Sequence, residues 1–317
     1  MLFYRRFTVY AAGFVLFAVA VYGCGGNAVK KSATQTKATD AATIGADAVA
    51  SGDTSRAIDK FKEAVRLDRT IDDRESELRD LISLSRAYLL EPNPDMATEY
   101  VNDAVRIALT LKNDERLSDA YATLSSACYA KGDYDAALLA INSASAIDDR
   151  LQKRSGAKLN IKGNVLIAMG RRAEAEQVCL SALSQAGKDG TLAETANAHR
   201  TLGFLSAGKS EYATAFDFYS KAYEIDKGFG YSAKVAVDLA GMGEAQFSLG
   251  KTAEAAGFFE RAYTVNLNAG RAGAAIENLD RLISIYKNAG DEPNVARFTA
   301  LKQKLAGKEH GNGTNVK

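Results

Sequence analysis

The sequence predicts an all-α protein, built as a solenoid of about seven helix-turn-helix hairpins. Three observations predict it. A small residue recurs at intervals of 38 to 40 residues along most of the chain, a turn-forming residue precedes each copy by five positions, and no run of β-branched residues alternates between turn signals as strands require. The recurring small residues are Ala57, Ala97, Ala137, Ala175, Ala215 and Ala255, with Val295 as a weaker seventh.

The stretch from 124 to 148 shows the unit most clearly. Gly132 can take the left-handed conformation that closes a first helix. In the helix expected after it, Ala137, Ile141 and Ala144 are spaced by four and three residues, so all three lie on one face. Two alanines flanking one bulky residue let this helix lie close against another.

Copies of this unit are needed, because one hairpin cannot bury its apolar face alone. The bulky position is Phe61, Val101, Ile141, Cys179, Tyr219, Phe259 and finally Thr299. The second alanine is Ala64, Ala104, Ala144, Ala182, Ala222 and Ala262, and Lys302 replaces it in the last copy. The turn residue is Gly52, Pro92, Gly132, Gly170, Ser210, Gly250 or Gly290. Polar residues in the seventh copy are typical of an end cap exposed to water.

These residues resemble a tetratricopeptide-repeat protein. The family's Leu-Gly pair is matched by Leu202-Gly203, and approximately by Lys162-Gly163 and Met242-Gly243. Its second-helix pattern of Ala, aromatic, Ala is matched by Ala215, Tyr219 and Ala222. The resemblance covers roughly residues 40 to 305 and implies a right-handed superhelical solenoid.

Two features depart from the family pattern. The chain has no Trp, although the family often has one in the first helix, and its period is nearer 40 than the usual ~34 residues. The longer period is similar to the repeats of Leu-Gly-Asn signalling scaffolds and kinesin light chains. We therefore expect longer helices or longer inter-repeat loops.

The N-terminus is expected to be a lipoprotein signal peptide over residues 1–23. Arg5 and Arg6 form a charged region, and an apolar run from 11 to 21 follows it. The segment Val21-Tyr22-Gly23-Cys24 then resembles the bacterial lipobox, in which the cysteine is acylated and the bond before it is cut. The alternative is an uncleaved signal anchor with an incidental cysteine.

Acylation of Cys24, with palmitate among the expected chains, would attach the protein to a membrane. Cleavage would remove both arginines and change the formal charge from +1 to −1. A nearly neutral chain gives no electrostatic reason to expect nucleic acid as a partner. Gly25 follows the cysteine, where an Asp resembles an inner-membrane retention signal in enteric-type bacteria. We therefore expect the outer membrane, facing the periplasm, rather than the inner membrane.

The remaining organisation is simple. Residues 24–39 are small and polar and are expected to form a flexible tether, residues 40–305 the solenoid, and residues 306–317 a disordered tail.

No set of residues indicates catalysis, a metal site or a cofactor. Cys128 and Cys179 fall inside the apolar pattern and are expected to be small buried residues, although a disulfide would be allowed in an exported protein. His199 is expected to be a half-buried structural residue, and His310 lies in the tail. No nucleophile elbow, phosphate loop or metal-binding pair is present. The sequence therefore predicts a protein that is not an enzyme.

The resemblance instead implies a binding groove, because the family's first helices line its concave side. The groove residues by this correspondence are Asn160, Asn164, Asn197, Arg200, Phe204, Glu244 and Phe247. Side-chain amides suit an extended peptide, because each can pair with a main-chain amide. Arg200 could bind a carboxylate. The alternative is that the asparagines are only tolerated on exposed faces and the phenylalanines pack inward.

Together these features predict a lipid-anchored, non-catalytic scaffold or assembly factor of the bacterial envelope that binds a protein or peptide. The first alternative is a regulator that senses a peptide or small ligand through a change of shape. A third possibility is an accessory subunit of an envelope enzyme. Fold alone does not decide among them.

Overall fold

The computed structural model describes residues 31–189 and 191–311, and over these residues the protein consists of fourteen α-helices without a strand. The predicted signal peptide and Cys24 lie outside them. The helices are α1 (Ala33–Ser51), α2 (Thr54–Thr70), α3 (Arg74–Leu90), α4 (Pro94–Leu111), α5 (Asp114–Ala130), α6 (Tyr134–Leu151), α7 (Gly156–Ala168), α8 (Arg172–Asp189), α9 (Leu192–Gly208), α10 (Tyr212–Phe229), α11 (Ser232–Ser248), α12 (Thr252–Asn268), α13 (Ala272–Asn288) and α14 (Glu292–Gly311).

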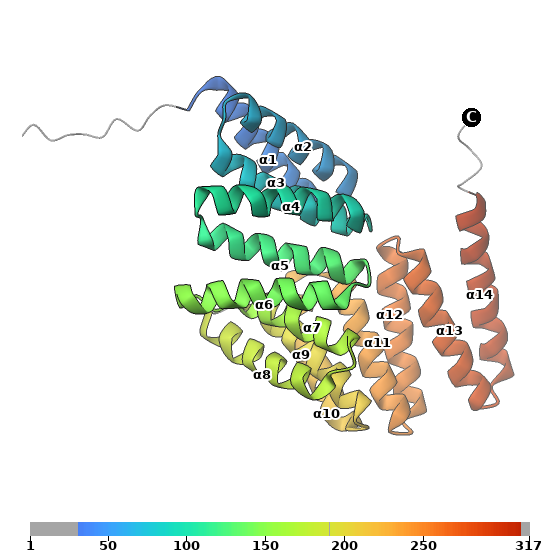
Figure 1. Ribbon diagram of the computed structural model, residues 1–317. Coiled ribbons are helices and arrows are strands. Elements are labelled where there is room, and N and C mark those ends of the chain that lie inside the picture. The colour runs from blue at the N-terminus through green and yellow to red at the C-terminus, as the bar shows by residue number, and fades with distance from the viewer. Residues whose placement is uncertain (1–30, 190, 312–317) are drawn as a thin grey trace, which may run out of the picture.

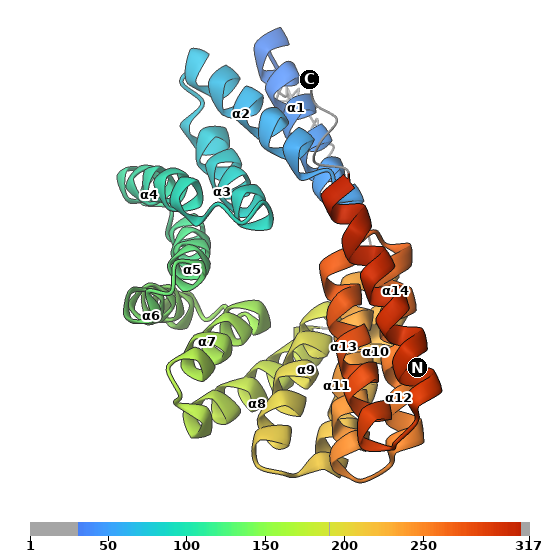
Figure 2. The ribbon, with the colours of Figure 1, turned by 90° about the vertical axis from the view of Figure 1, so that its right-hand side faces the viewer.

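Consecutive helices pair into seven hairpins that stack into a curved solenoid (Figure 1). The odd-numbered first helices also contact one another from α3 to α11, so they lie on the inner side of the curve. The even-numbered second helices lie on the outer side, and the array bends around its inner face (Figure 2). The predicted fold class is confirmed.

Long helices account for the long period. Helices α5 and α6 contain 17 and 18 residues, and the turn between them is short. Of the two expected explanations, the structure shows longer helices and not longer loops. The one short helix is α7, with 13 residues, and it produces the single interval of 38 between Ala137 and Ala175.

The repeated alanines are where the helices touch. The six predicted anchors and the six second alanines each have 0% of their surface exposed, and the bulky residues between them are buried up to Phe259. Each alanine permits the close approach that the spacing predicted. The seventh copy is more open, because Thr299 and Lys302 are partly exposed and Lys302 forms an ion pair with Asp280 at 2.5 Å.

The turns between paired helices have the expected chemistry. Gly132 has a φ of +79°, the left-handed region that a side chain disfavours. Asp133 then accepts a hydrogen bond from the backbone N–H of Ala136 at 3.0 Å, which satisfies one free donor of α6.

Both ends of the solenoid extend further than expected. Helix α1 begins at Ala33, inside the predicted tether of residues 24–39, because Ala38, Ala41 and Ala48 bury themselves as the first helix of the first hairpin. Helix α14 continues to Gly311, so residues 306–311 are helical where the sequence predicts a disordered tail. The polar composition of residues 33–39 concealed a helix that its packing against α2 supports.

Within residues 31–189 and 191–311, no helix has the length and apolar character needed to cross a membrane.

Candidate functional site

A hollow of about 390 Å³ opens on the concave face, where α5, α7, α9 and α11 meet above α10. Four of the seven predicted groove residues line it: Asn164, Arg200, Phe204 and Glu244. The other lining residues are Tyr129, Ile167, Thr201, Tyr219, Val237, Ala240 and Gly241. The structure therefore brings together residues from four hairpins at one place.

The walls of this hollow are largely apolar and open to solvent. Phe204 on α9 is 48% exposed and Val237 on α11 is 53% exposed, and both line the same concave hollow. Phe204 therefore does not pack inward, as the alternative interpretation of the sequence required. These side chains remain free to contact a partner.

The floor of the hollow is the ring of Tyr219, which reaches the inner face from a second helix. It can do so because glycines flank it on two first helices. A Cβ at Gly203 would lie 3.1 Å from the ring, and one at Gly241 would lie 2.6 Å from Cε1. The sequence marks Gly203 as part of the Leu-Gly pair, but Gly241 was missed because it falls outside that motif.

Asn164 supplies a free amide at the edge of the hollow. It lies on α7, is exposed, and forms no hydrogen bond with the described residues. An amide has both donor and acceptor atoms, so it can pair with a main-chain peptide group. Its position in the hollow is shown, and its role in binding stays a prediction.

Arg200 has a different environment from the one expected. Its Nε donates to Oδ1 of Asp238 at 2.6 Å, its Nη2 donates to Asp226, and its Nη1 donates to Oδ1 of Asn197 at 3.0 Å. Both carboxylates are 0% exposed. The expectation that Arg200 binds a partner's carboxylate was therefore wrong, because two carboxylates of the chain already occupy its guanidinium.

This network places one guanidinium between two carboxylates beneath the hollow. Burial raises the pKa of Asp238 to about 6, against the opposing effect of its bonds to Arg200. Burial also raises the pKa of Tyr219 to about 12, so its phenol stays neutral. The hollow consequently has an apolar surface over a buried, ion-paired base.

Two of the predicted asparagines are occupied by internal contacts. Asn160 is buried, and its Nδ2 donates to the backbone carbonyl of Glu194 at 3.1 Å, which ties α7 to α9. Oδ1 of Asn197 accepts a hydrogen bond from Nη1 of Arg200. Asn160 faces a neighbouring helix, whereas Asn197 bonds to a residue of its own helix, because the polar pattern on a helix does not show which side chains have internal partners.

The last two predicted residues lie on α11. Glu244 lines the hollow and forms an ion pair with Arg281 at 2.7 Å. Phe247 is half-buried and packs against the core that includes Phe259 and Leu279. For Phe247, the interpretation as an inward-packing residue is the correct one.

The other candidate residues agree with structural roles. His199 is half-buried, its ring lies 5.7 Å from that of Phe218, and burial lowers its pKa. Cys179 is buried, Cys128 is half-buried, and both are free thiols. No cluster of three metal-ligating side chains is found in the described part of the chain.

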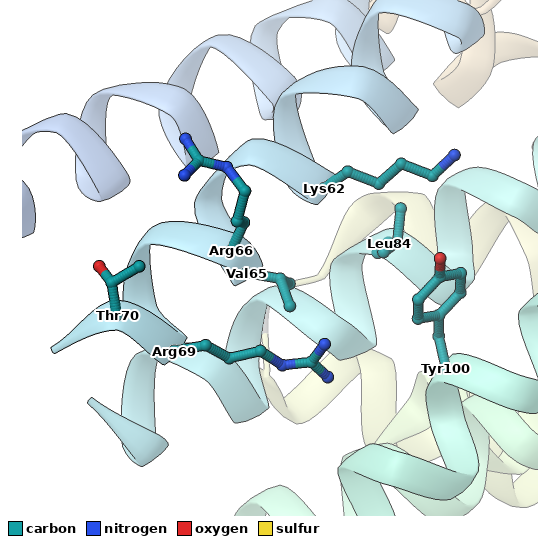
Figure 3. A pocket seen from close by; sticks show the side chains of 7 residues that line it. All are labelled: Lys62, Val65, Arg66, Arg69, Thr70, Leu84 and Tyr100. Carbon is teal, nitrogen blue, oxygen red and sulfur yellow. The ribbon is translucent and has the colours of Figure 1, made fainter. Parts of the chain in front are cut away.

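A second hollow, of about 360 Å³, lies on the outer side between α2, α3 and α4 (Figure 3). It is lined by Lys62, Arg66, Arg69 and Tyr100, among others. Arg69 is paired there with the buried Glu77 at 2.6 Å, so its charge has a structural partner. No predicted groove residue lies in this hollow. The concave hollow is therefore the candidate site.

Comparison with known proteins agrees with this architecture. Residues 194–268, from within α9 to the end of α12, match the family model described as tetratricopeptide repeat. No curated protein matches the chain.

Solved structures are similar in fold. BtubC (BKLC) from P. vanneervenii aligns with a TM-score of 0.60 and 19% identity, covering 72% of this chain and 94% of its own. PilF from Pseudomonas aeruginosa aligns with a TM-score of 0.55 and 20% identity, covering 74% of this chain and 93% of its own. A Rap protein complexed with competence and sporulation factor aligns with a TM-score of 0.67 and 13% identity, covering 88% of this chain and 77% of its own. At these identities the likeness shows the fold.

Replacing Arg200 with Ala is expected to lower the free energy of unfolding by about 3–5 kcal/mol, because it leaves buried carboxylates without their cation. Replacing Asn164 with Ala should change it by less than about 0.5 kcal/mol, since that side chain is exposed and unbonded. Urea unfolding of both variants measures the difference. Equal stability of the two would show that the Arg200 network does not stabilise the fold.

The loss of stability in Arg200→Ala should depend on pH, because Asp238 titrates within the network. The pKa of Asp238 is about 6 in the folded chain and about 3.9 when unfolded, so its contribution to stability is present below pH ~4 and is lost as pH rises through about 6. The deficit of Arg200→Ala should therefore be largest above pH ~6 and smallest near pH ~4. A deficit independent of pH would contradict the assignment of the charge network.

Proposed function

We propose that this tetratricopeptide-repeat protein is a non-catalytic interaction scaffold that binds an extended segment of a partner protein on its concave face. The observation that carries the proposal is the open apolar hollow at Phe204 and Val237, built from residues of four hairpins. A folded monomer rarely leaves such side chains together in a concave site without a ligand for them.

The hollow suits one apolar side chain with a stretch of main chain beside it. Phe204, Val237 and Tyr219 offer apolar surface, and the free amide of Asn164 lies at the edge where a peptide group can pair with it. Because Arg200 is already neutralised by Asp226 and Asp238, the site makes no strong demand for a charged ligand. An extended apolar segment is the ligand that these groups favour.

A second function has a specific observation in its favour. The hollow has the volume typical of a small-ligand site and three aromatic side chains in its lining, Tyr129, Phe204 and Tyr219. A fold similar to this one is known in a complex with competence and sporulation factor. The alternative is therefore a regulator that senses a peptide or small ligand at this same hollow.

We also infer that the protein is attached to a bacterial membrane through acylated Cys24, in the envelope and preferably at the outer membrane. The support is the sequence Val21-Tyr22-Gly23-Cys24 after a charged and apolar leader. A lipid anchor would hold the scaffold near partners in the same compartment.

A photo-crosslinking residue at position 204 tests the groove directly. Introduced in place of Phe204, it should capture a defined partner in cells, whereas the same residue in place of Leu139 should not. Leu139 is the matched control, because it is 71% exposed but lies on α6, an outer helix. Against the captured partner, Phe204→Ala should weaken binding by about tenfold or more, since it removes a central apolar contact. Crosslinks and affinity losses confined to position 139 would place the binding surface on the outer helices and overturn the proposal.

Mass spectrometry of protein extracted from membranes tests the anchor. The mature N-terminus should be a diacyl- or triacyl-cysteine at position 24, and Cys24→Ala should abolish it, because the thiol is the acylated group. A mature protein that still begins with Met1 would contradict the lipoprotein assignment, and would leave the groove proposal unaffected.

A further inference from the structure

The turn between α10 and α11 carries an exposed aromatic pair. The rings of Phe229 and Tyr231 stack with centroids 5.3 Å apart and an interplanar angle of 14°. Phe229 is 48% exposed and Tyr231 is 43% exposed, so the described residues leave nearly half of each side chain open to solvent. Gly230, with a φ of +70°, makes the sharp turn that places the two rings together.

Two lysines, at the same end of α10 and the start of α11, have no carboxylate partner among the described residues. The Nζ of Lys234 lies 5.1 Å from the ring centre of Tyr231, and the Nζ of Lys227 lies 5.5 Å from that of Tyr223. Among the described residues, no carboxylate lies within ion-pair distance of either lysine; the neighbouring Asp226 is buried against Arg200. The turn therefore presents aromatic surface beside two lysines without ion-pair partners.

Apolar side chains continue along the same edge of the solenoid. Leu192, at the start of α9, is 54% exposed, and Leu267, near the end of α12, is 39% exposed. Each lies beside a turn that joins a second helix to the next first helix, as the turn with Phe229 does. Consecutive turns of this kind lie along one edge of stacked hairpins. We call the side chains of Leu192, Lys227, Phe229, Tyr231, Lys234 and Leu267 the aromatic-lysine edge.

We propose that the aromatic-lysine edge docks on the surface of a membrane that contains anionic phospholipid. Aromatic side chains are favoured at the level of the lipid headgroups, where one end of the ring meets hydrocarbon and the other meets water. Lysines beside them are attracted to a negatively charged lipid surface and can extend their charged ends toward the phosphates. The unpaired lysines and the exposed rings supply both halves of that chemistry.

This contact would orient the scaffold on the membrane. Helices α10 and α11 carry both the aromatic-lysine edge and residues of the concave hollow, Tyr219 and Val237, so a contact at one fixes the position of the other. The docking surface stands apart from the groove, and its residues are not needed to bind a peptide there. It also does not depend on whether Cys24 is acylated.

The absence of tryptophan from the sequence allows a direct test in the full chain. Phe229→Trp places a single tryptophan at the turn, whose emission can be excited selectively over that of the tyrosines. Tyr134→Trp is the matched control, because Tyr134 is 36% exposed in another aromatic pair, but Lys131 beside it is ion-paired with Asp95 at 2.8 Å. Each variant is mixed with vesicles of phosphatidylcholine that contain phosphatidylglycerol and brominated acyl chains, and with vesicles of brominated phosphatidylcholine alone. Circular dichroism confirms that both variants remain folded.

The Trp at position 229 should show a blue-shifted emission and quenching by the brominated chains on the anionic vesicles, and the Trp at position 134 should show neither. Lys227→Gln with Lys234→Gln in the Phe229→Trp chain should remove most of the quenching, as should high salt, because both weaken attraction to the anionic surface. Equal quenching at the two positions, or equal quenching on neutral vesicles, would overturn the proposal. A shift induced by polyglutamate but not by vesicles would overturn it too, and would identify an acidic protein segment as the partner.

Discussion

Four of the seven hairpins depend on a contact in which a glycine of the first helix leaves space for a bulky side chain of the second helix. A Cβ at Gly243 would lie 2.8 Å from Cε2 of Phe259, and a Cβ at Gly163 would lie 2.6 Å from Sγ of Cys179. The two helices therefore pack at a separation that a larger first-helix residue would prevent. The second hairpin has Ser85 at this position, and its hydroxyl donates to the carbonyl of Ala97 at 2.8 Å, so the small residue there also satisfies its polar group. Once the pair is closed, its outer surface can pack against the next hairpin, and repetition of this step produces the curve.

The same contact creates the candidate site. In the fifth hairpin the bulky residue is Tyr219, and it meets a glycine on its own first helix, Gly203, and another on the next, Gly241. With no Cβ on either side, the ring reaches the concave face and becomes the floor of the hollow. The buried ion network of Arg200 lies beside it and joins α9 to α10 and α11. Packing and charge thus fix the geometry of a surface whose exposed parts, Phe204 and Val237, stay available to a partner.

The fold could be predicted because its determinants repeat, so that the alanine at position 215 is one of several copies with the same environment. The site could be predicted in part. Asn164 and Phe204 were found because the repeat register places them on the concave side, and they do line the hollow. Arg200 and Asn160 share that register, but their partners lie on neighbouring helices, and repeat spacing carries no information about which polar side chains pair with each other. The start of the solenoid differed for a similar reason, since α1 packs against α2 and a polar composition does not reveal that contact.

Contact between the first-helix glycine and the bulky residue closes these four hairpins, and a double-mutant cycle at Gly163 and Cys179 tests this most directly. Urea unfolding should show that Gly163→Ala lowers the free energy of unfolding by about 1–3 kcal/mol in the natural chain, because the new Cβ overlaps Sγ of Cys179. In a chain that carries Cys179→Ala, the sulfur is gone, and Gly163→Ala should instead raise stability by up to about 1 kcal/mol, as alanine does within a helix. A change of the same sign and size in both chains would contradict the claim.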